Sequence, residues 1–206
     1  MSLYAPADSV VVFDFETTGL SPAQGDRAIE IGAVLLQSGA VVDRFQALMN
    51  PGFAVSRFIA DYTGIDNHML ASAPPCSEVM QQFADFIQNY NLVAHNASFD
   101  WRFLQHELAA IDRTPHNQIT CSMLIARRLV QTAPKHSLGE LVEYLDIESD
   151  GVFHRALDDA EMTARLWLKL VQKLQQHYQV TQPDFKLMQQ IAKTPKAKLK
   201  QLFSNR

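Results

Sequence analysis

The sequence is poor in cysteine and contains no long apolar run. Its 206 residues include only two cysteines, Cys76 and Cys121, which is too few for a disulfide scaffold and is typical of proteins in a reducing cytoplasm. The first residues show no basic stretch followed by an apolar one, so we expect no signal peptide. Because no apolar run is long enough to cross a bilayer, we predict a cytoplasmic protein without a membrane segment.

Repeats and low-complexity linkers are also absent, and the charge is unevenly distributed. Hydrophobic residues make up 47% of the chain and charged residues 19%, a balance that predicts a globular protein with a sizeable core. Residues 181–206 hold six basic residues and one acidic residue, whereas the rest of the chain has a net charge of −9. We therefore predict a domain over residues 1–180 and a basic C-terminal extension over residues 181–206, partly helical and packed on the domain. Such an extension either contacts phosphates or is a solvated terminus.

Two kinds of hydrophobic periodicity follow one another along the chain. Apolar and β-branched residues first predict three strands joined by short links, at residues 9–16, 28–37 and 41–50. Apolar residues spaced three and four apart then predict helices, at residues 77–90, 98–111, 137–147 and 156–179. Ser77 and Ser137 are the expected N-caps of two of these helices, and residues 92–96 form an intervening strand. An antiparallel meander that continues into strand–helix units predicts an α/β fold with a mixed sheet.

The first predicted strand ends in two carboxylates, Asp14 and Glu16. Residues two apart on a strand point to the same face, roughly 6.6 Å apart along the chain, while Phe13 and Phe15 point to the other face and into the core. Two like charges at the end of a buried strand repel each other and are costly to desolvate. Either they are solvated acids, or a divalent cation with a preference for oxygen ligands compensates them.

Further acids stand at the starts of two predicted helices. Asp100 follows the short strand at residues 92–96, and Asp159 comes five residues after His154. Each has an ordinary structural interpretation, because acids such as Asp158 and Asp159 are favoured in the first turn of a helix. Their joint occurrence in one chain favours a shared site. The remaining histidines and the two cysteines show no spacing typical of zinc ligands.

Together, these residues resemble the three sequence motifs of the DEDDh 3′→5′ exonucleases. The motifs are Asp14-x-Glu16, Asp100 after the stretch HNASF, and His154 followed five residues later by Asp159. That family has the ribonuclease H-like fold and includes the epsilon proofreading subunit of bacterial DNA polymerase III. The resemblance covers roughly residues 8–172 and implies a mixed five-stranded sheet flanked by helices. His154 disfavours the sister branch, which has a tyrosine at this position.

The resemblance also implies a metal site. Two divalent ions, Mg²⁺ or Mn²⁺, would be held by Asp14, Glu16, Asp100 and Asp159. Asp14 and Asp159 would bind the ion nearest the nucleophile, and Asp14 would bridge to the second ion. Two ions about 3.5–4 Å apart activate a water molecule and stabilise the leaving oxygen of a phosphodiester.

A base and a set of substrate contacts complete the implied site. His154 would take the proton of the attacking water, for which an unperturbed imidazole pKa of about 6.5 is suitable. His95 is a rival candidate for this role. The segment after the metal ligands, Thr17, Thr18 and Gly19, would lie along the terminal nucleotide. Alternatively, these three residues only form a turn and Phe99 only packs in the core. The expected substrate contacts are Thr17, Thr18, Gly19, Leu20, Ile65, His95, Asn96 and Phe99.

The expected function is therefore a metal-dependent exonuclease that releases nucleoside 5′-monophosphates from DNA 3′ ends, in proofreading or repair. An RNA 3′-exonuclease of the same superfamily is the alternative, because the 2′-hydroxyl would be recognised by contacts that the sequence does not identify. An inactive nucleic-acid-binding module is an alternative of a different class, although no motif residue is missing. A polymerase or another replication or repair protein is the expected protein partner.

Overall fold

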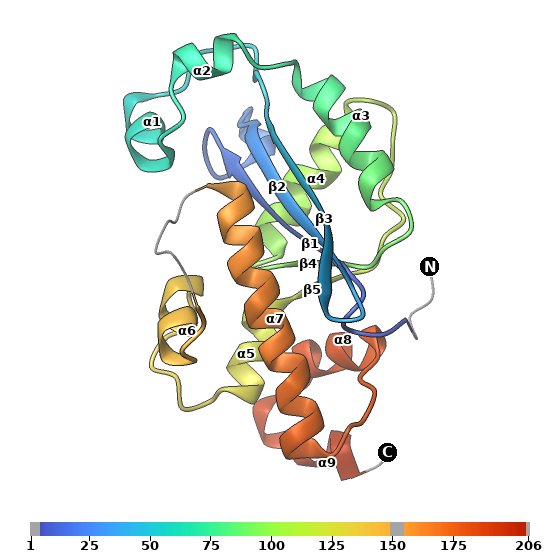
Figure 1. Cartoon of the computed structure of the whole chain (residues 1–206). Helices are drawn as coiled ribbons and strands as arrows, with labels where there is room; N and C mark the ends of the chain where they lie inside the picture. Colours follow the sequence, from blue (N-terminus) through green and yellow to red (C-terminus); the bar gives the residue numbers. More distant parts are fainter. Residues whose placement is uncertain (1–4, 149–154, 205–206) are drawn as a thin grey trace.

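One mixed five-stranded sheet forms the centre of the molecule (Figure 1). The structure, a computed structural model, describes residues 5–148 and 155–204. The strand order is β3-β2-β1-β4-β5, in which β1 pairs with β2, and β2 with β3, in antiparallel fashion, whereas β1–β4 and β4–β5 are parallel. The strands are β1 (Val11–Thr17), β2 (Ala28–Gln37), β3 (Ala40–Leu48), β4 (Leu92–Ala94) and β5 (Ile119–Cys121). The predicted sheet is thus confirmed.

Helices cover both faces of the sheet, which gives a three-layer arrangement (Figure 1). The faces are covered by α3 and α4 on one side and by α5, α6, α7 and α8 on the other. Along the described chain, no helix is both long enough and apolar enough to cross a membrane. The helix bounds are α1 (Arg57–Thr63), α2 (Asn67–Ala71), α3 (Cys76–Ile87), α4 (Ser98–Ala109), α5 (Ser122–Leu129), α6 (Leu138–Tyr144), α7 (Ala156–Tyr178), α8 (Phe185–Lys193) and α9 (Leu199–Ser204), with the 3-10 turns η1 (Pro22–Gln24) and η2 (Lys196–Lys198).

Strand β1 sends alternate side chains into the two cores. Phe13 and Phe15 pack with the residues of α3 and α4, as predicted, whereas Val12 packs with the residues of α7. Asp14 and Glu16 therefore continue the row of Val12 and lie on the face that α7 covers. The alternation explains how a buried strand presents two carboxylates to one side of the sheet.

Local signals in the sequence predicted most boundaries but not all. Strand β2 matches its predicted range in full, and the hairpin turn uses Ser38 and Gly39 with φ angles of 50° and 79°. The predicted N-cap at Ser77 is wrong, because the helix begins one residue earlier, at Cys76, and Pro75 occupies the N-cap position with φ −59°. Ser137 does occupy its N-cap position, although its side chain makes no capping hydrogen bond.

The described part of the C-terminal extension, residues 181–204, contributes to the core beside α7. Phe185 of α8 lies 6.5 Å from Trp167, ring centre to ring centre, and Phe203 of α9 lies 4.3 Å from Tyr178. Tyr178 is nineteen residues after Asp159 on the same helix, which places the two roughly 28 Å apart along its axis. The contact of α9 with α7 therefore lies at the end of the helix away from Asp159 (Figure 1).

Gly32 of β2 is the point where α7 comes closest to the sheet. A Cβ atom at this position would lie 2.1 Å from the backbone of Ala156 and Leu157, the first two residues of α7. Gly32 is also the partner of Asp14 across the β1–β2 ladder. Its missing side chain therefore lets the start of α7 approach the strand that carries the carboxylates.

We expect Gly32→Ala to lower the free energy of unfolding by about 3 kcal/mol or more, because helix backbone atoms cannot move aside locally. Gly39→Ala is the control: its Cβ would have only Leu168 Cδ2 at 4.0 Å, so its cost is the positive φ, about 1 kcal/mol. Urea denaturation measures both values. Equal losses in the two variants would contradict the role of the close approach.

Candidate active site

Three carboxylates converge where β1 meets the start of α7. Oxygen atoms of Asp14, Glu16 and Asp159 all lie within 4.8 Å of one another. The fourth motif carboxylate, Asp100 in the first turn of α4, accepts a hydrogen bond from the backbone N–H of Phe15 at 3.3 Å. The structure thus brings together the four predicted acids. The predicted base, His154, lies outside the described residues.

The carboxylates are held in a poorly solvated place. Glu16 and Asp100 are only 8% and 2% exposed. Burial raises the pKa of Asp14 well above its usual range, and the charges of Asp100, Asp159 and Glu16 raise it further. Burial, followed by the charge of Asp159, raises the pKa of Glu16 to about 8. Burial also raises the pKa of Asp100 to about 7, although hydrogen bonds from backbone N–H groups oppose the shift.

This arrangement fits a divalent cation. Clustered carboxylate oxygens are the ligands that Mg²⁺ and Mn²⁺ prefer, and a cation of charge two relieves the repulsion that otherwise raises the pKa values. Asp14, Glu16 and Asp159 are close enough to share an ion, and Asp100 lies beside them. Carboxylate oxygens are hard donors, which favours Mg²⁺ or Mn²⁺ over metals that select thiolate ligands.

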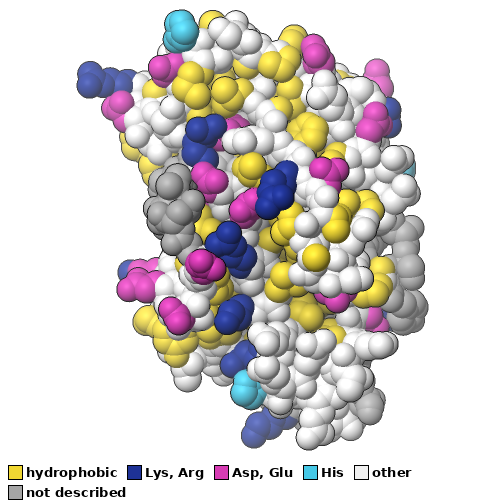
Figure 2. Space-filling view, viewed as in Figure 1, with side chains coloured by type: hydrophobic (Ala, Val, Ile, Leu, Met, Phe, Trp, Pro, Cys, Tyr) yellow, Lys and Arg dark blue, Asp and Glu magenta, His cyan; other side chains and the backbone are white. Residues whose placement is uncertain are grey.

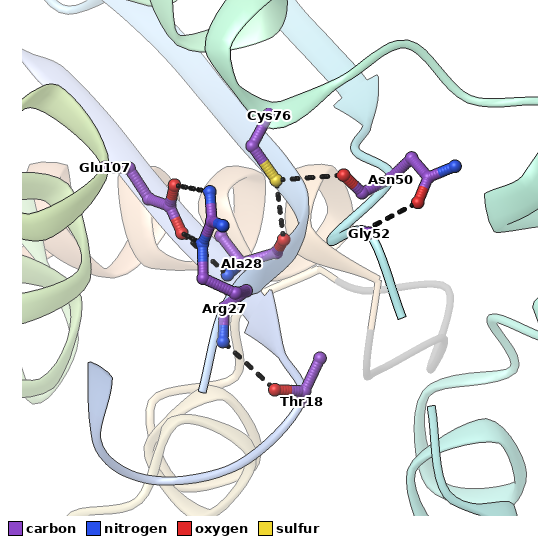
Figure 3. Close-up of polar contacts among 7 residues, drawn as sticks. All are labelled: Thr18, Arg27, Ala28, Asn50, Gly52, Cys76 and Glu107. Carbon is purple, nitrogen blue, oxygen red and sulfur yellow. Dashed lines mark hydrogen bonds and ion pairs between the residues drawn. The ribbon is translucent and has the colours of Figure 1, made fainter. Parts of the chain in front are cut away.

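The segment after β1 is fixed by an ion pair between Arg27, directly before β2, and the buried Glu107 of α4 (Figure 3). The carboxylate of Glu107, which is 1% exposed, accepts hydrogen bonds from Arg27 Nε at 2.8 Å and Nη2 at 2.7 Å and from the N–H of Ala28 at 3.2 Å. The backbone N–H of Arg27 in turn donates to Thr18 Oγ1 at 3.0 Å. The thiol of Cys76 lies 3.5 Å from the carbonyl oxygen of Ala28 on the same strand. These contacts connect the predicted substrate segment to the helix that carries Asp100.

A cavity of about 680 Å³ opens beside the carboxylates. Five of the predicted substrate contacts line it together with Asp14, Glu16 and Asp159, and they are Thr17, Thr18, Gly19, Leu20 and Phe99. Leu20 is 77% exposed and presents a large apolar side chain to this cavity. Thr17 Oγ1 donates to the carbonyl of Gly19 at 2.6 Å, which holds the turn against the cavity.

Ile65 and Asn96 do not line this cavity, contrary to expectation. Ile65 is fully buried and packs with Ile29, Val55 and Leu70. Its predicted contact with a terminal base is corrected to a packing role, because its side chain is not accessible to a ligand. Asn96 is exposed, with a φ of 68°, but it lies outside the cavity lining.

His95 is likewise engaged within the protein. Its Nδ1 lies 2.9 Å from Ser122 Oγ, and its Nε2 lies 2.9 Å from the carbonyl oxygen of His136. Since a carbonyl only accepts, the Nε2–H donates to His136, while Ser122 Oγ, which lies beside Nδ1, donates to the carbonyl of Ala94 at 3.2 Å. Burial lowers the pKa of His95 to about 4. The structure therefore supports neither a substrate contact nor a role as base for this residue.

Two aromatic residues that the sequence interpretation missed lie on α1 at the mouth of the cavity. Phe58 and Tyr62 are 73% and 53% exposed, and their rings stack at 6.0 Å with an interplanar angle of 10°. Burial, followed by the charges of Glu16, Asp159 and Asp14, raises the pKa of Tyr62. Hydrophobic side chains also gather in Figure 2 over the region of α1 and α2. The sequence did contain a signal for this pair, because aromatic residues four positions apart lie on one side of a helix.

The fold and the four acids define a nuclease of the DEDDh class. A family model described as Exonuclease (RNase_T) matches residues 11–167. The chain belongs to this exonuclease family.

Several relatives and solved structures are similar to this chain. A DNA polymerase III PolC-type protein of Oceanobacillus iheyensis is 44% identical over 168 residues, and the 3′-5′ exonuclease DinG of Bacillus subtilis is 35% identical over 167 residues. Each alignment covers 81% of this chain but only 12% and 18% of the respective relative, so the chain spans a small part of their length.

Among solved structures, Exonuclease X in complex with 5′ overhanging duplex DNA aligns with a TM-score of 0.67 at 25% identity, over 89% of this chain and 99% of that one. The nuclease domain of 3′hExo, a DEDDh family member bound to rAMP, aligns with a TM-score of 0.68 at 23% identity, over 80% and 92% of the two chains. The latter likeness shows the fold alone.

The raised pKa values predict a link between pH, metal and stability. Folded Glu16 keeps its proton up to a pH of about 8, whereas its ordinary pKa is 4.5, so the folded state binds more protons between these values. The free energy of unfolding of the metal-free protein should therefore fall as the pH rises from about 5 to 8. Mn²⁺ replaces the protons, so it should raise the Tm by at least about 4 °C more at pH 8 than at pH 5.5.

Thermal unfolding with EDTA and with Mn²⁺ tests this link. Glu16→Gln should flatten the pH profile and lose most of the Mn²⁺ effect, while Glu143→Gln, an exposed acid on α6, should keep both. Equal stabilisation by Mn²⁺ at the two pH values would show that the carboxylates are not the metal ligands.

Proposed function

We propose that this chain is a metal-dependent 3′→5′ exonuclease that releases nucleoside 5′-monophosphates from the 3′ ends of DNA. The observation that carries the proposal is the convergence of Asp14, Glu16 and Asp159 within 4.8 Å, with Asp100 beside them, at the edge of an open cavity. Membership of the exonuclease family supports the reaction, and the relative named 3′-5′ exonuclease DinG supports the direction.

The site residues would have three different roles in hydrolysis of the phosphodiester. Asp14, Glu16, Asp100 and Asp159 hold two Mg²⁺ or Mn²⁺ ions, which supply charge neutralisation and an acidified water when bound. His154 takes the proton of the attacking water, since an imidazole of ordinary pKa is a suitable base near neutral pH. Thr17, Thr18 and Gly19 orient the terminal nucleotide.

DNA is the proposed substrate, because the PolC-type relatives are DNA polymerases by name and Exonuclease X was solved with duplex DNA. RNA remains the alternative, since one structural neighbour is named for recognition of a histone mRNA stem-loop. An inactive binding module is disfavoured because the four acids are present and clustered. We further propose a cytoplasmic location and association with a polymerase or another replication or repair protein.

The aromatic pair on α1 would hold the bases near the 3′ end. Phe58 and Tyr62 stand on one side of the cavity that Leu20 and Phe99 also line. Stacking on an aromatic face tolerates every base and contributes about 1–3 kcal/mol per base. This mode suits an enzyme that must remove any terminal nucleotide.

An end-labelling experiment tests the direction and the metal requirement. A 5′-labelled single strand should give a ladder of progressively shorter products that stops with EDTA, and a 3′-labelled strand should release the mononucleotide at once. Asp14→Asn should lose both turnover and Mn²⁺ binding, whereas His154→Ala should lose turnover and keep Mn²⁺ binding. Immediate release of a 5′-labelled mononucleotide would show the opposite polarity.

Removal of the aromatic pair should weaken substrate binding without changing the chemical step. Phe58→Ala and Tyr62→Ala should each raise the KM for single-stranded DNA about tenfold and change kcat by less than about threefold, since each loses one stacking face. Tyr144→Ala is the control, because Tyr144 is 45% exposed on α6 and outside the cavity lining. A KM unchanged in both α1 variants would remove the pair from the binding site.

A further inference from the structure

One buried carboxylate on the sheet forms hydrogen bonds with the start of α7. Glu30 of β2 has no exposed surface, and it accepts hydrogen bonds from Arg155 Nη2 at 2.7 Å and Arg155 Nε at 3.1 Å. The same carboxylate accepts the N–H of Ala156 at 3.1 Å and the side-chain amide of Gln46 at 3.0 Å. The residue before α7 and its first residue are thus held by a single side chain.

These hydrogen bonds of Glu30 lie directly beside the proposed metal ligands. Glu30 is the partner of Glu16 across the β1–β2 ladder. Asp159 comes three residues after Ala156, within the first turn, so the start of the helix determines where its carboxylate lies. Gly32, two residues along β2 from Glu30, leaves room for the same turn of α7.

We propose that Glu30 and Arg155 are positioning residues for Asp159: they fix the first turn of α7 so that this carboxylate reaches the ion shared with Asp14 and Glu16. The inference rests on the proposed function, in that a divalent cation occupies the site. Glu30 is fully buried whereas the Arg155 side chain is 36% exposed, and a buried carboxylate is costly without its partner, so the pair keeps Arg155 and the start of the helix against β2.

A second ion pair of the same design provides an internal comparison. Glu107 and Arg27 hold α4, which carries Asp100 seven residues before Glu107 and therefore on the same side of the helix. Each buried glutamate accepts hydrogen bonds from the Nε and Nη2 groups of one arginine and from one backbone N–H. One pair holds the helix of Asp159, and the other holds the helix of Asp100.

The first test compares metal binding, turnover and stability. In EDTA-treated protein, Arg155→Lys and Glu30→Gln should raise the Kd of Mn²⁺ about tenfold, lower kcat by a similar factor and change KM by less than about twofold. Leu174→Ala is the stability control, since Leu174 is buried on the same helix but fifteen residues from Asp159. It should lower the Tm and leave the Kd of Mn²⁺ unchanged.

The second test combines variants and reads Mn²⁺ binding by EPR, which also detects weak sites. Arg155→Lys should add no further loss in an Asp159→Asn background and should add its full loss in an Asp100→Asn background. Arg27→Lys should show the reverse pattern. If Arg155→Lys has the same effect in both backgrounds, or if Leu174→Ala reproduces its effect, the pair serves stability alone and the proposal is wrong. If the wild type binds Mn²⁺ but cleaves no DNA or RNA, the proposed function fails while the binding comparison still decides the role of the pair.

Discussion

Repulsion among clustered carboxylates is the constraint on which the rest of this structure depends. Asp14, Glu16 and Asp159 lie within 4.8 Å of one another, with Glu16 buried and the two aspartates half-buried. Burial, together with the charge of Asp159, raises the pKa of Glu16 to about 8, so without a cation the cluster gains protons. Such a cluster persists only on rigid supports, and the chain supplies a central strand and the starts of two helices.

The topology of the sheet explains how distant segments meet at this point. Strands β1 and β4 are parallel neighbours, so their carboxyl ends lie at the same edge of the sheet. Glu16 lies one residue before the end of β1 and Asp14 two residues earlier, and Asp100 follows β4 at the start of α4. Helix α7 then packs across β1 and β2 and brings Asp159 to the same edge, because Gly32 leaves space for its first turn. The two arginine–glutamate pairs hold both helices against β2.

The sequence predicted those features that depend on nearby residues. The continuous apolar run of β2 and the long amphipathic pattern of α7 each predict their element from neighbouring residues alone. The motif acids are likewise recognisable from the residues beside them. Helix α1 has seven residues and β5 has three, too few for a period to be read, so the aromatic pair on α1 was missed. Glu30 and Arg155 are 125 residues apart, and nothing in either neighbourhood indicates their pairing. Ile65 was misplaced because an apolar residue beside a turn suits a core as well as a binding site.

The charge distribution is consistent with a site that recognises bases as well as phosphates. Residues 1–180 carry a net charge of −9, and Figure 2 shows basic and acidic side chains interspersed on the face that carries α7. A polyanion gains little from such a surface beyond the contacts that bound cations provide. The cavity offers instead the exposed side chains of Leu20, Phe58 and Tyr62, whose contact with bases does not depend on charge. In the proposed function, the carboxylates would hold ions at the scissile phosphate, and the apolar side chains that line the cavity would hold the end of the strand.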